Sequence, residues 1–234
     1  MTRIQGVLFD LDGTLADTAP DLAWALNETL HLNGRKPLPF ETIRPAVSHG
    51  GIALIHLGFG IESDNPDFEP LRQTFLRIYQ DNICRQTRLF PGMAEVLDEL
   101  EQRAIPWGIV TNKPAWLTNP LLAAMKLDRR AASIISSDTT AERKPHPLPM
   151  LTACRQLGSE PRETLYIGDA ERDIQAAHNA GMPALVALFG YIGEEDRPGE
   201  WGAEGMIAAP NNLSAWLERE YPTIEPGDTD PLSR

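Results

Sequence analysis

The chain has 234 residues, of which 33 are acidic and 21 are basic, so its formal net charge at neutral pH is −12. Phosphate backbones and anionic lipid headgroups would repel such a chain, which argues against nucleic-acid partners and membrane-surface binding. Hydrophobic residues make up 42% and charged residues 23% of the sequence, and these proportions are typical of a globular fold rather than a disordered chain.

The first residues and the two cysteines predict a cytoplasmic protein. Asp10 and Asp12 interrupt the first apolar run, which is therefore too short and too acidic for a secretory signal peptide. The longest apolar stretch, residues 183–192, is far shorter than the roughly 20 residues that cross a bilayer. Cys84 and Cys154 form neither a close pair nor a metal-type cluster, so we expect two reduced thiols.

A short buried strand is predicted near the start of the chain, followed by a helix. Residues 4–9 form a nearly continuous apolar run that ends in acidic residues and glycine, which is typical of a strand buried on both faces. Pro20 suits a first helical turn, and Leu22, Leu26 and Leu30 then recur at helical spacing. Up to about residue 88 no convincing strand follows, and residues 52–57 and 68–83 have helical patterns.

Beyond residues 90–92, whose sequence is Phe-Pro-Gly, short apolar strands alternate with helices. The predicted strands are residues 107–111, 133–136, 164–167 and 184–188. The predicted helices are residues 93–100, 116–125, 148–157 and 172–180. This alternation indicates βαβ units and a parallel sheet with helices on both faces.

These elements predict an α/β protein with a Rossmann-like parallel-sheet core and an inserted all-helical cap domain. The core comprises residues 1–16 and 89–222, and the cap comprises residues 17–88. Residues 223–234 have the composition of a frayed, flexible tail and receive no role.

Polar residues follow the predicted strands at the edge where open α/β sheets bind ligands. Crowded carboxylates cannot all ionise without a cation between them, so Mg²⁺ is the expected bound metal ion. A lysine with hydroxyl and amide donors would complete a cradle for a phosphoryl group, so the pattern predicts phosphoryl transfer. The residues concerned are Asp10, Asp12, Thr111, Asn112, Lys144, Asp169 and Asp173.

Each of these groups also has a purely structural interpretation. Asp12 with the following glycine could form a hairpin turn, and Thr111 could be a helix N-cap. Lys144 could be a solvated surface charge, and Asp173 could interact with a helix dipole. We favour the functional interpretation because chemically complementary groups fall at four strand ends of one topology.

Four segments resemble the motifs of the haloacid dehalogenase superfamily: DLDGT at 10–14, Thr111-Asn112, Lys144-Pro145 and GDAERD at 168–173. The resemblance spans residues 4 to about 210. The helical insertion is similar to the C1 cap of the phosphoglycolate phosphatase-like branch. Within that branch, residues 195–198 and 201–203 most resemble the N-acetylmuramic acid 6-phosphate phosphatases of peptidoglycan recycling.

The resemblance implies a role for each motif residue. Asp10 would be the nucleophile that forms an aspartyl-phosphate, and Asp12 would be the general acid and base. The phosphate would be held by Thr111, Asn112 and Lys144. The Mg²⁺ would be bound by Asp10, the backbone carbonyl of Asp12 and Asp169, with Asp173 supporting the metal site. In the cap, the residues that could reach the substrate are Arg44, Ser48, His49 and Gly50, whose structural interpretation is helix termini and turns.

The expected activity is hydrolysis of a small phosphorylated metabolite. Phosphate monoesters hydrolyse so slowly that enzymes accelerate the reaction up to ~10²¹-fold, and splitting it into two displacements by a carboxylate helps. Dehalogenases of the superfamily lack the second aspartate, so Asp12 argues for phosphate over halide. N-acetylmuramic acid 6-phosphate is the expected substrate; 2-phosphoglycolate, a phosphomutase reaction and a non-enzymatic metal-binding role are alternatives. A monomer and a homodimer are both consistent with the sequence.

Overall fold

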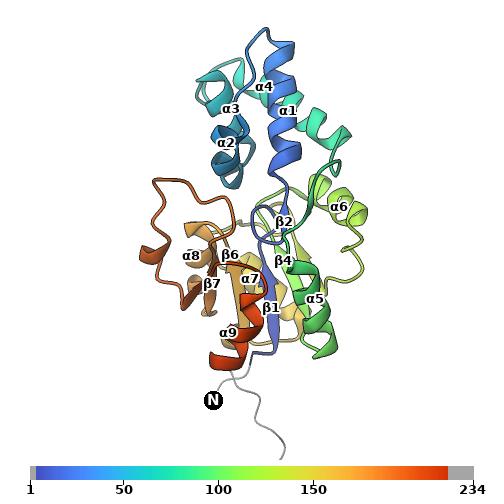
Figure 1. Cartoon of the computed structure of the whole chain (residues 1–234), viewed down its shortest axis with the longest axis vertical. Helices are drawn as coiled ribbons and strands as arrows, with labels where there is room; N and C mark the ends of the chain where they lie inside the picture. Colours follow the sequence, from blue (N-terminus) through green and yellow to red (C-terminus); the bar gives the residue numbers. More distant parts are fainter. Residues whose placement is uncertain (1–3, 221–234) are drawn as a thin grey trace, which may run out of the picture.

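The computed structural model describes residues 4–220 and shows a helical cap standing on an α/β core (Figure 1). The core contains a six-stranded sheet in the order β5-β4-β1-β6-β7-β8, in which all neighbouring strands are parallel. Its strands are β1 (Gly6–Phe9), β4 (Trp107–Val110), β5 (Ser133–Ile135), β6 (Thr164–Gly168), β7 (Ala184–Ala187) and β8 (Gly205–Ile207). The α/β fold with a parallel sheet, predicted from the sequence, is confirmed.

The prediction omitted the last strand and the last helix of the core. β8 has three residues and lies at the edge of the sheet, where Met206 is 51% exposed, so the segment lacks the continuous buried run that marks the other strands. Helix α9 (Asn212–Glu220) follows it. Leu213, Trp216 and Leu217 of α9 are buried and have helical spacing, a signal that the sequence does carry.

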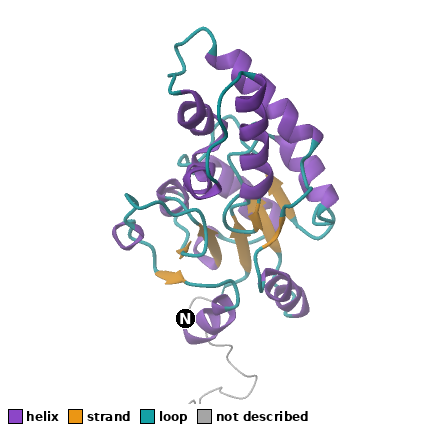
Figure 2. Ribbon diagram, turned by 45° about the horizontal axis from the view of Figure 1, so that its top comes forward, coloured by secondary structure: helices purple, strands orange, loops and turns teal. Residues whose placement is uncertain are grey.

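Helices cover both faces of the sheet (Figure 2). The core helices before α9 are α5 (Met93–Gln102), α6 (Ala115–Ala124), α7 (Leu148–Leu157) and α8 (Glu171–Asn179), with short 3₁₀ helices η2 (Pro161–Glu163) and η3 (Pro198–Glu200) in loops. Val7 and Phe9 of β1 join an apolar cluster with residues of α5, α6 and α9, whereas Leu8 joins a second cluster with residues of α7 and α8. Burial on both faces explains the continuous apolar sequence of β1.

The cap is helical, as predicted. It consists of α1 (Ala19–Leu32), α2 (Phe40–Ile43), the 3₁₀ helix η1 (Arg44–His49), α3 (Gly50–Phe59) and α4 (Phe68–Asp81). Two chain segments connect it to the core, and they pair as the antiparallel strands β2 (Ala16–Asp17) and β3 (Arg88–Leu89). The cap therefore enters and leaves the core through one narrow two-stranded connection.

A buried carboxylate ties these two connecting segments together. Asp21, in the first turn of α1, is 1% exposed. Its oxygens accept hydrogen bonds from the backbone N–H groups of Gln86 and Thr87 and from the Thr87 hydroxyl, at 2.8 to 3.0 Å. This cluster of hydrogen bonds fixes the start of α1 to the segment by which the chain returns to the core.

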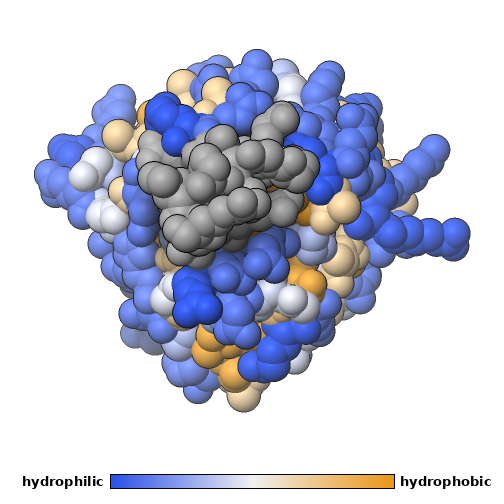
Figure 3. Space-filling model, turned by 90° about the horizontal axis from the view of Figure 1, so that it is seen from below, coloured by the Kyte–Doolittle hydropathy of each residue, from blue (hydrophilic) through white to orange (hydrophobic). Residues whose placement is uncertain are grey.

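The surface agrees with the acidic composition. The face opposite the cap is mostly hydrophilic where the described residues are visible (Figure 3). Among residues 4–220, none of the helices has both the length and the apolar character that a membrane span requires. The tail assigned to residues 223–234 lies outside the described residues.

Candidate active site

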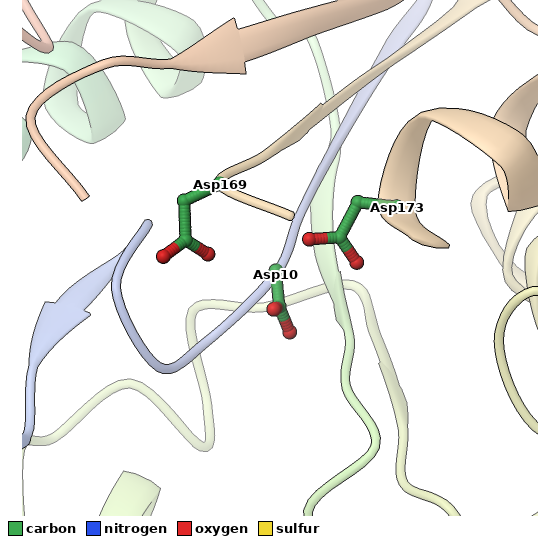
Figure 4. A group of neighbouring side chains, drawn as sticks. All are labelled: Asp10, Asp169 and Asp173. Atoms are coloured by element: carbon green, nitrogen blue, oxygen red, sulfur yellow. The ribbon is translucent and has the colours of Figure 1, made fainter. Parts of the chain in front are cut away.

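Three buried aspartates meet at the carboxyl ends of β1 and β6 (Figure 4). Asp10 follows β1, Asp169 follows β6, and Asp173 lies in the first turn of α8. Each offers one carboxylate oxygen, and these oxygens all lie within 4.8 Å of one another. Neighbouring parallel strands end at the same edge of a sheet, which explains how residues more than 150 positions apart in the sequence form one cluster.

Glycines let the backbone pass close to Asp169. Gly13, in the loop after β1, has φ of +85°, and a Cβ atom there would lie 2.2 Å from Asp169 Oδ2. A Cβ atom at Gly190, after β7, would lie 2.3 Å from Asp169 Cβ. Side chains at either position would collide with the carboxylate, so both glycines are needed for the packing around it.

The cluster carries more negative charge than its neighbours neutralise. Burial, together with the charges of Asp10 and Asp173, raises the pKa of Asp169 to about 7. Burial also raises the pKa of Asp10, although Lys144 opposes this shift. An all-oxygen donor set with unneutralised charge suits a hard divalent cation, so these three residues could hold a metal ion.

Lys144 lies inside this cluster and is not a surface charge, because it is only 2% exposed. Its ammonium nitrogen lies 2.9 Å from Asp10 Oδ1 and 2.8 Å from Asp173 Oδ1. The same nitrogen donates to the carbonyl of Val110 and to the hydroxyl of Tyr166, both at 2.9 Å. Four partners thus fix the ammonium group beside the carboxylate of Asp10.

Asn112 and Thr111 lie near Lys144 in different roles. Both polar ends of the Asn112 amide bond the backbone of Lys144, donating to its carbonyl at 3.0 Å and accepting from its N–H at 3.1 Å. The amide that we expected to contact a phosphate therefore positions the lysine in this structure. The Thr111 hydroxyl accepts a hydrogen bond from the Lys113 N–H at 3.1 Å, which leaves its own proton for another acceptor.

Asp12 points toward the cap and has its own partners. Its carboxylate forms an ion pair with Lys113 at 2.9 Å and accepts a hydrogen bond from the Thr18 hydroxyl at 2.6 Å. Thr18 directly precedes α1, so this contact joins the core to the start of the cap. Lys113 follows Thr111 and Asn112 at a predicted strand end, although no role was predicted for it.

The 3₁₀ helix η1 brings part of the cap onto the aspartate cluster. The Ser48 hydroxyl donates to Asp169 Oδ2 at 2.7 Å, and the Arg172 guanidinium donates to the Ser48 carbonyl. Ser48 and His49 line one pocket together with Asp169 and Arg172. The cap therefore touches a carboxylate of the candidate metal site directly.

The contacts found for the other two cap candidates are with residues outside the aspartate cluster. Arg44 donates to the Phe189 carbonyl at 3.2 Å, and its guanidinium lies 4.9 Å from the centroid of the Tyr191 ring. Gly50 is exposed, has φ of +76° and joins η1 to α3. Its structural interpretation as a turn residue fits this position better than a contact with substrate.

Tyr191 was absent from the predicted site, yet it connects the site to the base of the cap. Its backbone N–H donates to Asp169 Oδ2 at 2.8 Å. Its hydroxyl accepts from the N–H groups of Thr18 and Ala19 at 2.6 and 2.8 Å and donates to Asp17 at 2.8 Å. The partners of the hydroxyl group are more than 170 residues away in the sequence, so no local pattern indicates them.

Comparisons with known proteins agree with this geometry. The sequence profile described as haloacid dehalogenase-like hydrolase matches residues 7–187. A protein of Xylella fastidiosa strain Temecula1 named phosphoglycolate phosphatase is 44% identical over 208 residues, which cover 89% of this chain and 90% of that protein. A protein of Pseudomonas aeruginosa strain PAO1 named N-acetylmuramic acid 6-phosphate phosphatase is 38% identical over 217 residues, which cover 93% of this chain and 96% of that protein.

A solved structure also superposes closely. The crystal structure of a "predicted phosphoglycolate phosphatase" from Haemophilus somnus 129PT has a TM-score of 0.81 and 27% sequence identity. The superposition covers 92% of this chain and 99% of that chain. The similarity thus includes both the sheet that carries the aspartates and the helical cap above them.

Proposed function

We propose a substrate, a cofactor and a mechanism for this chain, which belongs to the haloacid dehalogenase-like hydrolase family and is a phosphatase. It hydrolyses a small phosphorylated metabolite, with Mg²⁺ as the cofactor. The observation that carries the proposal is the buried cluster of three aspartates with Lys144 bound between two of them. Three carboxylates outnumber the two cations beside them, Lys144 and Arg172, which suits the binding of a metal together with a phosphoryl group.

The metal would be held by Asp10, Asp169 and the backbone carbonyl of Asp12, with Asp173 supporting the site. Bound there, Mg²⁺ would neutralise charge on phosphate oxygens and orient the phosphoryl group. Lys144 would neutralise charge from the side of Asp173, and the Thr111 hydroxyl would donate its free proton to a phosphate oxygen. The side-chain amide of Asn112 would hold Lys144 in place by bonding the backbone of Lys144.

In the first step, a carboxylate oxygen of Asp10 attacks phosphorus while the ester P–O bond breaks. Asp12 must first take up a proton despite its ion pair with Lys113; it then gives this proton to the departing alcohol oxygen, and an aspartyl-phosphate remains on Asp10. In the second step, water attacks the same phosphorus and transfers a proton to Asp12. The bond between phosphorus and Asp10 breaks, which releases inorganic phosphate and restores both aspartates.

The proposed substrate is N-acetylmuramic acid 6-phosphate, in a cytoplasmic peptidoglycan-recycling role. Two observations support it: the relative from Pseudomonas aeruginosa that carries this name covers 93% of the chain, and residues 195–198 and 201–203 resemble that group. A second candidate is 2-phosphoglycolate, favoured by the 44% identity to the Xylella fastidiosa protein named for that substrate.

The test is phosphate release by the purified full chain with Mg²⁺ and each of the two substrates. We expect kcat/KM to be higher for N-acetylmuramic acid 6-phosphate and Asp10→Asn to abolish release from both. Asp64→Asn, an equal change of charge at an exposed cap residue, is the matched control and should leave the rates unchanged. Undiminished release by Asp10→Asn would contradict the mechanism, and isomerised product without net phosphate release would indicate a mutase.

A further inference from the structure

A lysine and a tyrosine lie close together where the cap meets the core, beside Asp12. Lys113 comes from the core, between β4 and α6, and Tyr79 comes from α4 of the cap. The ammonium nitrogen of Lys113 lies 4.6 Å from the centroid of the Tyr79 ring and 2.9 Å from Asp12 Oδ1. Neither residue has a part in the mechanism described above.

The Tyr79 hydroxyl is buried without a hydrogen-bond partner. Tyr79 is 0% exposed, and among the described residues its hydroxyl proton has no acceptor, while its oxygen faces the Lys113 ammonium group. Buried polar groups are nearly always paired in folded proteins, so an unpaired one needs an explanation. Burial raises the pKa of Tyr79 to about 12, which keeps the hydroxyl protonated and able to donate.

Lys113 is a buried cation whose donors are only partly used. Its hydrogen bonds within the described part of the chain go to the two oxygens of Asp12, at 2.9 and 3.3 Å. An ammonium group has three N–H donors, and the single carboxylate of Asp12 does not use all of them. Burial disfavours the charge, but the attraction of Asp12 outweighs this and raises the pKa of Lys113, so it stays charged.

A charged ammonium group with an unused donor and a hydroxyl proton without an acceptor suit an anionic ligand group with two oxygens. Phosphate is one such group, but it is already bound at the aspartate cluster in the proposed mechanism. The leaving-group side of the substrate lies next to Asp12, since Asp12 protonates the departing oxygen. The group that Lys113 and Tyr79 bind therefore belongs to the alcohol part of the substrate.

We propose that Lys113 and Tyr79 form a subsite for a carboxylate on the alcohol part of the substrate, assembled when the cap meets the core. The inference rests on the proposed phosphatase function and narrows its substrate class to phosphate monoesters of hydroxy acids. Both candidate substrates meet this requirement, because glycolate and muramic acid each carry a carboxylate. The simpler interpretation is that Lys113 serves only as the partner of Asp12.

Matched pairs of esters test the subsite with the full chain and Mg²⁺. N-acetylmuramic acid 6-phosphate is compared with N-acetylglucosamine 6-phosphate, which lacks only the lactyl group. 2-Phosphoglycolate is compared with 2-hydroxyethyl phosphate, which has an alcohol in place of the carboxylate. For the pair that contains the true substrate, we expect kcat/KM to favour the acid by about 10- to 100-fold, as charge-assisted hydrogen bonds would give.

Variants then locate the effect. Lys113→Met should lower kcat/KM for the acid by about tenfold more than for its neutral partner, and Lys113→Arg should restore part of the preference. Tyr79→Phe removes only the unpaired hydroxyl, so it should fold normally and reduce the preference by about 3- to 10-fold. Lys36→Met, which removes an exposed cap lysine, is the matched control for lost charge.

The outcomes separate the subsite from the phosphatase function. Equal kcat/KM for acid and neutral esters in the unmodified chain would overturn the subsite and leave the phosphatase intact. Equal losses on both esters in Lys113→Met, with no change in preference in Tyr79→Phe, would also overturn it and leave Lys113 as the partner of Asp12. If no ester were hydrolysed, or if Asp10→Asn stayed active, the proposed function itself would fail.

Discussion

Lys144 in the core and Ser48 in the cap both touch the aspartate cluster, but they are held in different ways. Lys144 is almost fully buried and has four polar partners, all supplied by the core. Ser48 lies on a short 3₁₀ helix and reaches the core through its hydroxyl bond to Asp169 and the bond that its carbonyl accepts from Arg172. The core thus holds Lys144 through four polar contacts, whereas Ser48 meets the core through two hydrogen bonds.

This difference indicates that the core and the cap serve different steps of the catalytic cycle. Groups that neutralise phosphate charge must be in place before the reaction, and a rigid core supplies that preorganisation. A substrate must enter and its product must leave, which requires contacts between cap and core that break at small cost. Removing a core contact should therefore affect the reaction strongly, and removing a cap contact should affect it weakly.

The largest expected effect comes from Lys144→Met. It should lower kcat/KM by about 1000-fold, because it removes the only cation that contacts both Asp10 and Asp173 within the described chain. It should also lower the free energy of unfolding by about 3–5 kcal/mol in metal-free buffer, since it leaves buried carboxylates unpaired. Steady-state kinetics and urea denaturation measure the two effects. If kcat/KM and the free energy of unfolding fell no more than in the Lys36→Met control, the contrast between core and cap would be contradicted.

An intermediate effect is expected from pH in metal-free protein. The folded-state pKa of Asp169, about 7, lies above the ordinary aspartate pKa of 3.8, so between these values the folded state holds a proton that the unfolded state has lost. Stability should therefore fall as pH rises from about 4 to about 7, and by several degrees in melting temperature. Mg²⁺ should restore most of the lost stability because its binding neutralises the ionised carboxylates.

Asp169→Asn is the control for that experiment. It removes the titrating carboxylate, so the fall in melting temperature between these pH values should be much smaller in chelator-treated protein. Thermal denaturation of both proteins, with chelator and with Mg²⁺, measures the effect. An identical pH profile in the two proteins would contradict the assignment of the titration to this cluster.

The smallest effect is expected from Ser48→Ala, which removes the cap hydroxyl that contacts Asp169. We expect KM to rise by about 3- to 10-fold with little change in kcat, because one hydrogen bond between cap and core is lost. Ser63→Ala, at an exposed cap position, is the matched control. A loss in kcat as large as that of Lys144→Met would show that the cap takes part in the reaction itself.

The sequence predicted the part of the site that follows from sheet topology. Asp10 and Asp169 come directly after apolar runs, and parallel strands place such residues at one edge. The direct contact of Lys144 with Asp10 and Asp173 agrees with the predicted convergence. Asp10 and Asp169 are marked by their position directly after a strand, which a local pattern reveals.

The rest depends on contacts that no local pattern encodes. Tyr191 reaches the start of α1 across more than 170 residues, and Lys113 pairs with Asp12 across 101. The family resemblance assigned Asn112 to phosphate, and no sequence pattern indicated that its side-chain amide also bonds the Lys144 backbone. β8 was missed because it is short and half-exposed at Met206, so the two-sided burial that marks the other strands is absent.

The central claim is that Asp10 becomes phosphorylated during the reaction. The most direct measurement is mass spectrometry of Asp12→Asn after rapid mixing with p-nitrophenyl phosphate and Mg²⁺ and quenching in acid, because nitrophenolate departs without needing a proton from residue 12. Without Asp12 to accept a proton from water, the second step should be slow, and one phosphoryl group should accumulate on the peptide that contains Asp10. Phosphate release without any phosphorylated Asp10, or phosphorylation at another residue, would contradict the account.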